Sequence, residues 1–441
     1  MRRSFLALAV LFAPTLALAS PVETNLRVQD IPSTAGFAIV GGERAYSTGA
    51  VWCNLGDVQL SWNGTNAAHT ISVHNLMRIE HGAIRHLGAS WVSHQFCALQ
   101  TAICSSCTPA GAGCPPALGI GCSTTSTASS LANQPQMSRR SEVNASTGSF
   151  PFPFSVGSPS GPLERRCRVA TSEVDPALHP GATFVMELVS IHPSEGDPNA
   201  RCATRDLHPA SMLGTPLPLG PTAAGSTAIE RWAALEPTVT LRVIDLPGDG
   251  RVQVGCNVIE EPDGSYRYEY AIANIDSHES IGSFAVPLPA GATVIATSSH
   301  LPAPHSGEVT SGEPWSIAIT PDAVRHATEP FASNPNANAI RWATLGSITL
   351  VTDRPPVEGS VELGTFRSGE TLILSLPVPG PATTLVGDLD GDGSVASSDL
   401  AILLGAWGPC RGCPADLDGN GSVEAADLAL LLGVWSPAGI S

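Results

Sequence analysis

The chain has 441 residues and a formal net charge of −17, and only 14% of its residues are charged. All 22 basic residues are arginine, because the sequence contains no lysine. The absence of lysine excludes Schiff-base catalysis, lysine general bases and the lysine-dependent P-loop. The acidic balance disfavours electrostatic attraction to nucleic acid or to anionic membranes, so no nucleic-acid partner is expected.

The N-terminus has the pattern of a secretory signal peptide, predicted over residues 1–19. Arg2 and Arg3 precede an apolar run at Phe5–Leu18, and Ala17-Leu18-Ala19 places small residues at the cleavage site. The run is shorter than the roughly 20 residues that a membrane helix needs, so no membrane span is expected. We therefore expect a secreted or cell-surface protein whose mature chain begins at Ser20, with an uncleaved anchor as the alternative.

Eleven cysteines in an exported chain predict disulfides, because the compartment is oxidising. Four of them, Cys104, Cys107, Cys114 and Cys122, lie in a stretch of small residues and prolines, 101–161, which we interpret as a long cross-linked irregular loop. A zinc site on the Cys-x-x-Cys pair is the alternative, although no second close pair follows at zinc-finger spacing. Nine cysteines precede residue 380, so at least one of them is unpaired or bridges to the C-terminal segment.

The fold class predicted for the chain is mainly β, because 43 glycines and 38 prolines favour short strands joined by turns over long helices. Residues 20–235 are predicted to form a β-rich, disulfide-containing N-terminal region. Its alternating segments include Val58–Trp62 and Thr70–Val73, and Thr183–Ile191 is a further strand. Proline-rich Leu213–Thr227 is interpreted as a linker.

Residues 236–379 predict an antiparallel β-sandwich of immunoglobulin or fibronectin size. Pro262-Asp-Gly264 between two strands is a hairpin signal, and Tyr266, Tyr268 and Tyr270 alternate on one strand face. That face is interpreted as core, with a sugar-stacking platform as the alternative. The predicted strands are Thr238–Ile244, Val252–Glu260, Tyr266–Asn274, Ser283–Pro287, Thr293–Ser298, Trp315–Ile319, Ile340–Val351, Ser360–Phe366 and Thr371–Val378.

A linker at 380–386 leads to a C-terminal segment, 387–441, that carries a calcium-binding pattern. Carboxylates occur at loop positions 1, 3 and 5 (Asp388, Asp390 and Asp392), a glycine follows at position 6, and Asp399 closes the loop at position 12. Calcium takes 6–8 oxygen ligands, and a loop of about 12 residues can wrap them around the ion. The backbone carbonyl of Ser394 is expected to complete the first ligand set.

The pattern recurs 28 residues later, which predicts a second calcium ion. Its ligands are expected to be Asp416, Asp418, Asn420, the carbonyl of Ser422, and Asp427. Each loop runs into an apolar segment predicted to be helical, Leu400–Trp407 and Leu428–Trp435. Seven Asp and one Glu against one Arg give this segment a net charge of −7, so we expect it to be disordered in chelator.

The paired loops, each closing on Asp, resemble a dockerin type I module over residues 387–441. The resemblance implies a small helical calcium-binding tail that docks a secreted protein, often a polysaccharide-degrading enzyme, onto a cohesin-like or cell-surface partner. In that family a pair of residues at loop positions 10 and 11 selects the partner. Here the first repeat has Ser397-Ser398, whereas the second has Ala425-Ala426, and Gly405 and Gly433 replace the usual basic residues. Cys410 and Cys413 are expected to form a local disulfide.

The body resembles a group of uncharacterised exported bacterial proteins that carry such tails. The resemblance extends over most of residues 45–375, and it implies no enzymatic activity for the chain. Its segments are Cys53-Asn-Leu-Gly, Ser90-Trp-Val-Ser-His94, Arg140-Ser-Glu-Val-Asn-Ala-Ser-Thr-Gly148, Tyr268-Glu-Tyr270 and Asn334-Pro-Asn-Ala-Asn-Ala-Ile-Arg-Trp342.

No group of residues in the body matches a known catalytic pattern, so no catalytic residue is assigned. Glycoside hydrolysis needs two carboxylates, and the loop acids Asp276, Glu279, Glu308 and Glu313 are interpreted as solvated surface groups. The clustered histidines, His69, His74, His81, His86 and His94, are interpreted as scattered surface residues, with a copper or zinc site as the alternative. A non-catalytic surface or matrix protein is therefore favoured over a polysaccharide-degrading enzyme and over a carbohydrate-binding protein.

Overall fold

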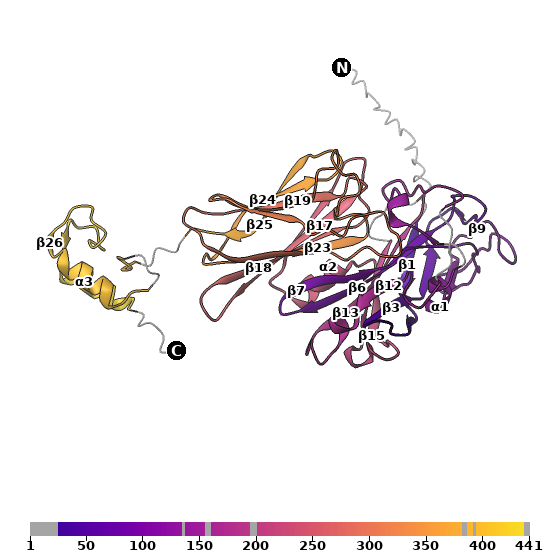
Figure 1. Ribbon diagram of the computed structural model, residues 1–441, viewed down its shortest axis with the longest axis horizontal. Helices are drawn as coiled ribbons and strands as arrows, with labels where there is room; N and C mark the ends of the chain where they lie inside the picture. Colours follow the sequence, from indigo (N-terminus) through magenta and orange to yellow (C-terminus); the bar gives the residue numbers. More distant parts are fainter. Residues whose placement is uncertain are drawn as a thin grey trace, which may run out of the picture.

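The computed structural model describes residues 25–134, 137–154, 160–194, 201–381, 386–390 and 394–435. The fold is mainly β, as predicted, and consists of several antiparallel sheets with a few short helices (Figure 1). The predicted signal peptide lies outside the described residues. In the part of the chain that is described, no helix combines the length and the apolarity needed to cross a membrane.

The N-terminal region is built around one large sheet in the order β11-β8-β6-β13-β14-β15, with β7 paired to β6. Two three-stranded sheets (β1-β4-β10 and β12-β3-β2) and the pair β5-β9 flank it. The strands are β1 Leu26–Asp30, β2 Thr34–Gly36, β3 Glu43–Thr48, β4 Ala50–Asn54, β5 Leu60–Ser61, β6 Ile71–Glu80, β7 Ala83–Ala89, β8 Val92–His94, β9 Ala117–Leu118, β10 Ser123–Ser126, β11 Met137–Ser138, β12 Cys167–Ala170, β13 Thr183–Ile191, β14 Cys202–Leu207 and β15 Pro218–Ala224. The helical turns are α1 Ala128–Ala132, η1 Arg140–Glu142, η2 Thr171–Val174 and η3 Pro209–Ser211.

The linker predicted at Leu213–Thr227 is wrong, because its middle, Pro218–Ala224, forms strand β15. This strand pairs with β14 on one side only and ends the large sheet. Proline cannot donate a hydrogen bond to a neighbouring strand, so it is tolerated at the edge of a sheet. The prolines of this segment therefore mark an edge strand, not a connection between domains.

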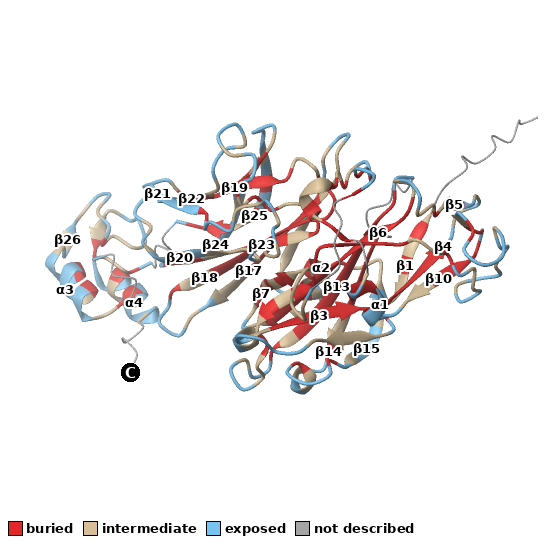
Figure 2. Cartoon of the chain, turned by 45° about the vertical axis from the view of Figure 1, so that its right-hand side comes forward, coloured by how far each residue is buried: buried red, intermediate tan, exposed pale blue. Residues whose placement is uncertain are grey.

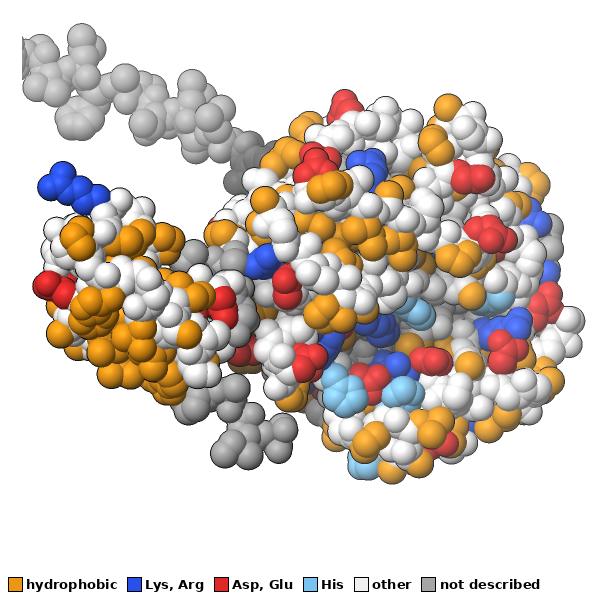
Figure 3. Space-filling model, turned by 60° about the vertical axis from the view of Figure 1, so that its left-hand side comes forward, with side chains coloured by type: hydrophobic (Ala, Val, Ile, Leu, Met, Phe, Trp, Pro, Cys, Tyr) orange, Lys and Arg blue, Asp and Glu red, His pale blue; other side chains and the backbone are white. Residues whose placement is uncertain are grey.

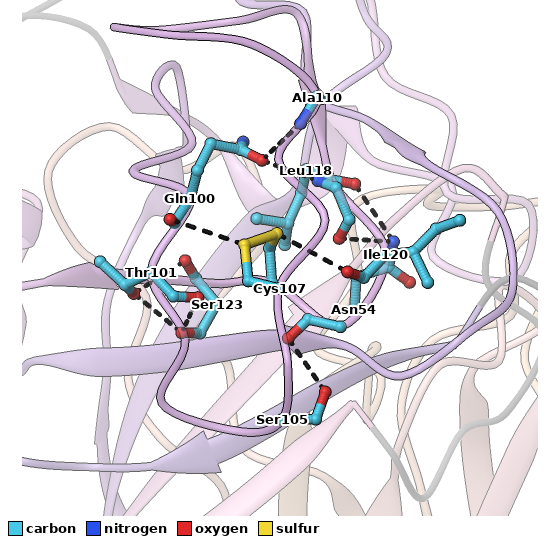
Figure 4. The surroundings of a disulfide bond; sticks show 12 residues. Asn54, Gln100, Thr101, Ser105, Cys107, Ala110, Leu118, Ile120 and Ser123 are labelled. Carbon is cyan, nitrogen blue, oxygen red and sulfur yellow. Dashed lines mark hydrogen bonds between the residues drawn. A yellow bond between two sulfur atoms is a disulfide. The ribbon is translucent and has the colours of Figure 1, made fainter.

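Disulfides cross-link the cysteine-rich stretch, as predicted. Cys53 is bonded to Cys104, Cys97 to Cys114 and Cys107 to Cys122. Cys104 and Cys107 thus have different partners, which rules out the zinc alternative. Around the Cys107 bridge, the side-chain amide of Gln100 accepts from the N–H groups of Ala110 (3.0 Å) and Gly119 (2.9 Å) (Figure 4).

The stretch is less irregular than predicted. Residues 123–126 form β10, which pairs with β4, and α1 follows with Thr127 as its N-cap, accepting from Ser130 N–H at 3.1 Å. The strand and the helix were not predicted because the segment consists of small hydroxyl residues, which give no strong hydrophobic periodicity. The remaining cysteines of the body, Cys167, Cys202 and Cys256, are buried thiols.

Residues 240–379 form two packed five-stranded sheets, β16-β17-β18-β23-β20 and β21-β22-β19-β24-β25 (Figure 2). The hairpin at Gly264 (φ +81°) joins β17 to β18, as predicted. The strands are β16 Thr240–Asp245, β17 Arg251–Glu260, β18 Tyr266–Asn274, β19 Ile281–Pro287, β20 Val294–His300, β21 Ser316–Ile319, β22 Ala323–Ala327, β23 Thr344–Thr352, β24 Pro356–Thr365 and β25 Thr371–Pro379. Strand β22 was not predicted.

The alternating tyrosines of β18 belong to the core. Tyr268 and Tyr270 are buried, and Tyr266 packs against the same cluster. Their hydroxyls donate to backbone carbonyls, Tyr268 to Arg354 at 2.9 Å and Tyr270 to Pro377 at 2.7 Å. The core interpretation is confirmed, and this face cannot stack on sugar rings.

Helix α2 (Ala228–Leu235) lies at the junction between the N-terminal region and the sandwich. Thr227 and Glu230 form a capping box at its start, and Trp232 is buried. One cluster of buried residues takes members from both sides of the junction, for example Ile71 and Leu345. The domain boundary predicted at 235/236 therefore crosses a shared hydrophobic core.

Candidate metal centre

The C-terminal segment is a tandem repeat that packs on itself. Its elements are α3 Ser397–Gly405, β26 Gly408–Pro409, β27 Ser422–Val423 and α4 Ala425–Gly433. Equivalent residues of the two repeats, such as Leu403 and Leu431, are buried together with Val395 and Val423. Each helix begins about three residues before the predicted start, because the loop-closing aspartate lies within its first turn.

The first loop brings three predicted ligands together. Carboxylate oxygens of Asp388, Asp390 and Asp399 all lie within 4.8 Å of one another. Asp399 is held in place by backbone N–H groups: Leu389 and Asp390 donate to Oδ1 at 2.6 and 3.2 Å, and Ala396 donates to Oδ2 at 2.8 Å. Predicted ligand Asp392 and its neighbour Gly393 lie outside the described residues.

The second loop has the same arrangement, with equivalent hydrogen bonds to its closing aspartate. Carboxylate oxygens of Asp416, Asp418 and Asp427 lie within 4.8 Å of one another. Asp427 accepts from Leu417 (2.7 Å) and Asp418 (3.1 Å) through Oδ1 and from Glu424 (2.8 Å) through Oδ2. The geometry is therefore encoded by the repeated sequence, and it is independent of what surrounds each loop.

A tight turn orders the middle of the second loop. Asp416 accepts from Asn420 N–H (3.1 Å) and Gly421 N–H (2.8 Å), and the Asn420 side-chain oxygen accepts from Ser422 N–H (2.9 Å). Gly421 has a φ of +92°, a conformation that favours glycine. The turn places predicted ligand Asn420 beside the acidic group. The carbonyls of Ser394 and Ser422 stay predicted ligands.

Electrostatics favour a cation at both loops. Burial opposes ionisation of Asp399, but the N–H groups of Ala396, Leu389 and Asp390 outweigh it and hold its pKa below the ordinary value. The N–H of Glu424 lowers the pKa of Asp427 in the same way. Three charged carboxylates so close together repel one another unless a cation lies between them. Oxygen-only ligands suit a hard divalent ion, so the residues present fit calcium.

The histidine cluster is not at the surface, and that interpretation was wrong. His69, His74, His86 and His94 are buried, whereas His81 is exposed. His69 Nε2 lies 2.9 Å from His94 Nδ1, while His74 contacts Thr48 and His86 contacts Leu345 N–H. Among the described residues, only the two aspartate groups form a cluster that could hold a metal.

The loop acids of the body do not converge. Asp276 is buried in an ion pair with Arg201 at 2.6 Å, so its interpretation as a solvated group was wrong. Glu279 accepts from Ser368 N–H at 2.8 Å, and Glu313 is exposed. Glu308 is the only carboxylate among the described residues that line the cleft between the N-terminal region and the sandwich.

Sequence reasoning missed this cleft, which is lined by Trp91, Arg140, Arg341 and Trp342 among others. A signal was present, because residues from three of the segments singled out in the sequence analysis, 90–94, 140–148 and 334–342, line it.

Comparison with known proteins assigns no family to the chain. No protein-family model matches it, and no curated protein matches it. Among solved structures, the N-terminal domain of the Streptococcus gordonii adhesin Sgo0707 matches at a TM-score of 0.20 and 8% identity, over 81% of this chain and 96% of that chain. A likeness at this level supports no argument about fold or function.

Proposed function

We propose that the chain is a secreted protein whose C-terminal segment is ordered by two calcium ions and attaches a non-catalytic β-sandwich body to an extracellular partner. The observation that carries this proposal is the repeated aspartate group, in which each loop joins three carboxylates to the first turn of a helix. The disulfides of the body support an oxidising location.

The helices of the tail leave apolar side chains in solvent at equivalent positions. Ile402 and Leu430 are 41% and 43% exposed, and Leu404 and Leu432 are 50% and 52% exposed. Hydrophobic side chains gather over this small unit in Figure 3. Contiguous exposed apolar surface on a small domain is typical of protein–protein contact. This surface is the proposed attachment face, and a cohesin-like or cell-surface protein is its proposed partner.

Calcium acts on this face through the closing aspartates. Asp399 and Asp427 belong to the loops and also to α3 and α4, so a bound ion fixes the start of each helix. The buried core of the tail is small: among its described residues, only Val395, Leu403, Ala415, Val423 and Leu431 are buried apolar residues. Metal binding is therefore expected to contribute much of its folding free energy.

The attachment role is tested by fractionating cells that produce the full-length chain. We expect the protein at the cell surface, released by EDTA, and shifted to the medium by the double substitution Leu404→Glu, Leu432→Glu. The control is Ile373→Glu on β25, which is 61% exposed, and this variant is expected to stay attached. Equal distribution of both variants, or retention in EDTA, contradicts the proposal.

Two alternatives remain as proposals. A polysaccharide-degrading enzyme acting on O-glycosyl bonds would need a second carboxylate across from the reacting bond, and Glu308 has no such partner in the described lining of its cleft. A carbohydrate-binding protein would need a surface other than the buried tyrosines of β18. Reducing-sugar release from a glycan panel supports the first alternative, and binding without release supports the second.

A further inference from the structure

A cleft with about 630 Å³ of empty space, its open mouth included, lies between the N-terminal region and the sandwich. The N-terminal region contributes the end of β7 and the two residues after it (Ala89–Trp91) and the start of η1 (Arg140 and Ser141). The sandwich contributes the segments 301–310, between β20 and β21, and 338–344, before β23. The cleft thus exists only because the two parts of the body pack together.

The walls of the cleft are largely apolar. Trp91 and Trp342 line it together with Leu301, Pro302 and Pro304. Both indole N–H groups are already used, since Trp91 donates to the His305 carbonyl at 3.3 Å and Trp342 donates to the Arg140 carbonyl at 2.9 Å. The rings therefore offer a ligand apolar surface and no hydrogen-bond donor.

Most polar groups of the lining are also used by the walls. Glu308 accepts from the N–H groups of Arg140 (2.9 Å) and Val309 (3.0 Å) and from the Ser141 hydroxyl. His305 Nε2 lies 2.8 Å from the Ala89 carbonyl and its Nδ1 lies 2.8 Å from a serine hydroxyl. These hydrogen bonds join the walls of the cleft to each other, so the groups have little hydrogen-bonding capacity left for a ligand.

Arg341 differs, because much of its donor capacity is unused. Its Nη2 donates to the carbonyls of Pro335 (2.8 Å) and Ala337 (3.1 Å), and its guanidinium stacks 5.2 Å from the Phe366 ring centroid. Nε is buried, and neither Nε nor Nη1 has a hydrogen-bond partner within the described residues. Burial, reinforced by the charge of Arg367, lowers the pKa of Arg341 to about 10, so it stays cationic at neutral pH.

We propose that the cleft binds a small carboxylic acid with a flat apolar body, its carboxylate on Arg341 and its body against the indoles of Trp91 and Trp342. Among the lining residues, two arginines and Glu308 give a net charge of +1, which a monoanion neutralises. A phosphate dianion would be repelled by Glu308. A polyhydroxylated acid would bury hydroxyls against walls most of whose polar groups are already paired.

The test is calorimetric titration of the full-length protein with benzoate, its neutral amide benzamide, and glucuronate. We expect saturable binding of benzoate, and binding at least about tenfold weaker for benzamide and glucuronate. Arg341→Gln and Ala303→Phe, which narrows the cleft at an exposed lining position, are each expected to weaken benzoate binding about tenfold. Arg242→Gln on β16, whose side chain is 41% exposed and pairs with Glu358 at 3.1 Å outside the cleft, is the matched control and is expected to bind benzoate like the native protein.

Any one of the following results overturns the proposal. These are no saturable benzoate binding by the native protein, benzamide as tight as benzoate, glucuronate tighter than benzoate, and full binding by Arg341→Gln. Thermal unfolding of each variant is measured alongside, so that loss of binding is compared only among folded proteins. Full binding by the folded Ala303→Phe variant also places the ligand elsewhere and overturns the assignment to this cleft.

Discussion

Replacing Arg140 tests whether the N-terminal region and the sandwich fold as one unit. The side chain is buried, and its guanidinium donates to both parts. Nε donates to the Ser90 carbonyl at 2.6 Å, and Nη2 donates to the His74 carbonyl at 3.1 Å and to Asn75 Oδ1 at 2.8 Å. Nη1 donates to the Ala343 carbonyl of the sandwich at 2.9 Å.

Arg140→Met keeps the aliphatic stem and removes these four hydrogen bonds. At about 2 kcal/mol for each bond to a charged group, the loss is roughly 8 kcal/mol. Burial offsets part of this loss, because it lowers the pKa of Arg140 from 12.5 to about 10, a cost of roughly 3 kcal/mol for the charged form. The free energy of unfolding is therefore expected to fall by about 5 kcal/mol.

Urea denaturation followed by tryptophan fluorescence measures the effect. The control is Arg139→Met at the neighbouring position, whose side chain is 36% exposed and lies 3.8 Å from Glu142. Its effect is expected to stay below about 1 kcal/mol. Equal unfolding midpoints for the two variants would refute the reasoning, and so would an Arg140→Met loss below about 1 kcal/mol.

Two further predictions concern pH and the tail disulfide. Burial lowers the pKa of His74 and of His94 from 6.5 to about 3, helped by Arg140 for His74 and by His69 for His94. The unfolded chain then binds more protons than the folded one between these pKa values, so stability falls as the pH drops below about 6.5. At pH 5 the free energy of unfolding is expected to be lower by about 2 kcal/mol for each histidine. Equal midpoints of urea unfolding at pH 7 and pH 5 would contradict this prediction. The Cys410–Cys413 turn supports the second loop, because Cys410 N–H donates to the Gly421 carbonyl at 3.0 Å and Asp416 N–H donates to the Cys413 carbonyl at 3.1 Å. Replacing both cysteines with serine is expected to weaken calcium binding about tenfold at the second loop and to leave the first loop unchanged. Calcium titration in an Asp399→Asn background measures the second loop, and titration in an Asp427→Asn background measures the first. Equal weakening of calcium binding at both loops would contradict the prediction.

The tail could be predicted from sequence because its geometry is local. All predicted ligands of a loop lie within 12 consecutive positions, and the repeat supplies an internal check. The hydrogen bonds to Asp399 and Asp427 span ten residues or fewer, so no distant contact is needed to form them. The same reasoning found the hairpin at Gly264 and the disulfide between Cys410 and Cys413.

The body was harder to predict because its polar groups are placed by distant contacts. His69 precedes β6, which begins at Ile71, so strand alternation does not govern its direction. It meets His94 across the sheet instead, at 2.9 Å. Asp276 was predicted to be solvated because Arg201, its buried partner, lies 75 residues away in the sequence. The cleft joins residues as distant as Ala89 and Thr344, and no local pattern encodes such a meeting.

The central claim is that two calcium ions order the tail. It is tested most directly by calorimetric calcium titration of the full-length chain, with circular dichroism before and after addition of EDTA. We predict two bound ions for the native chain, one for Asp427→Asn, and none for the double variant Asp399→Asn, Asp427→Asn, with helical signal lost in EDTA. A native chain that binds no calcium, or a double variant that still binds two ions, would contradict the account.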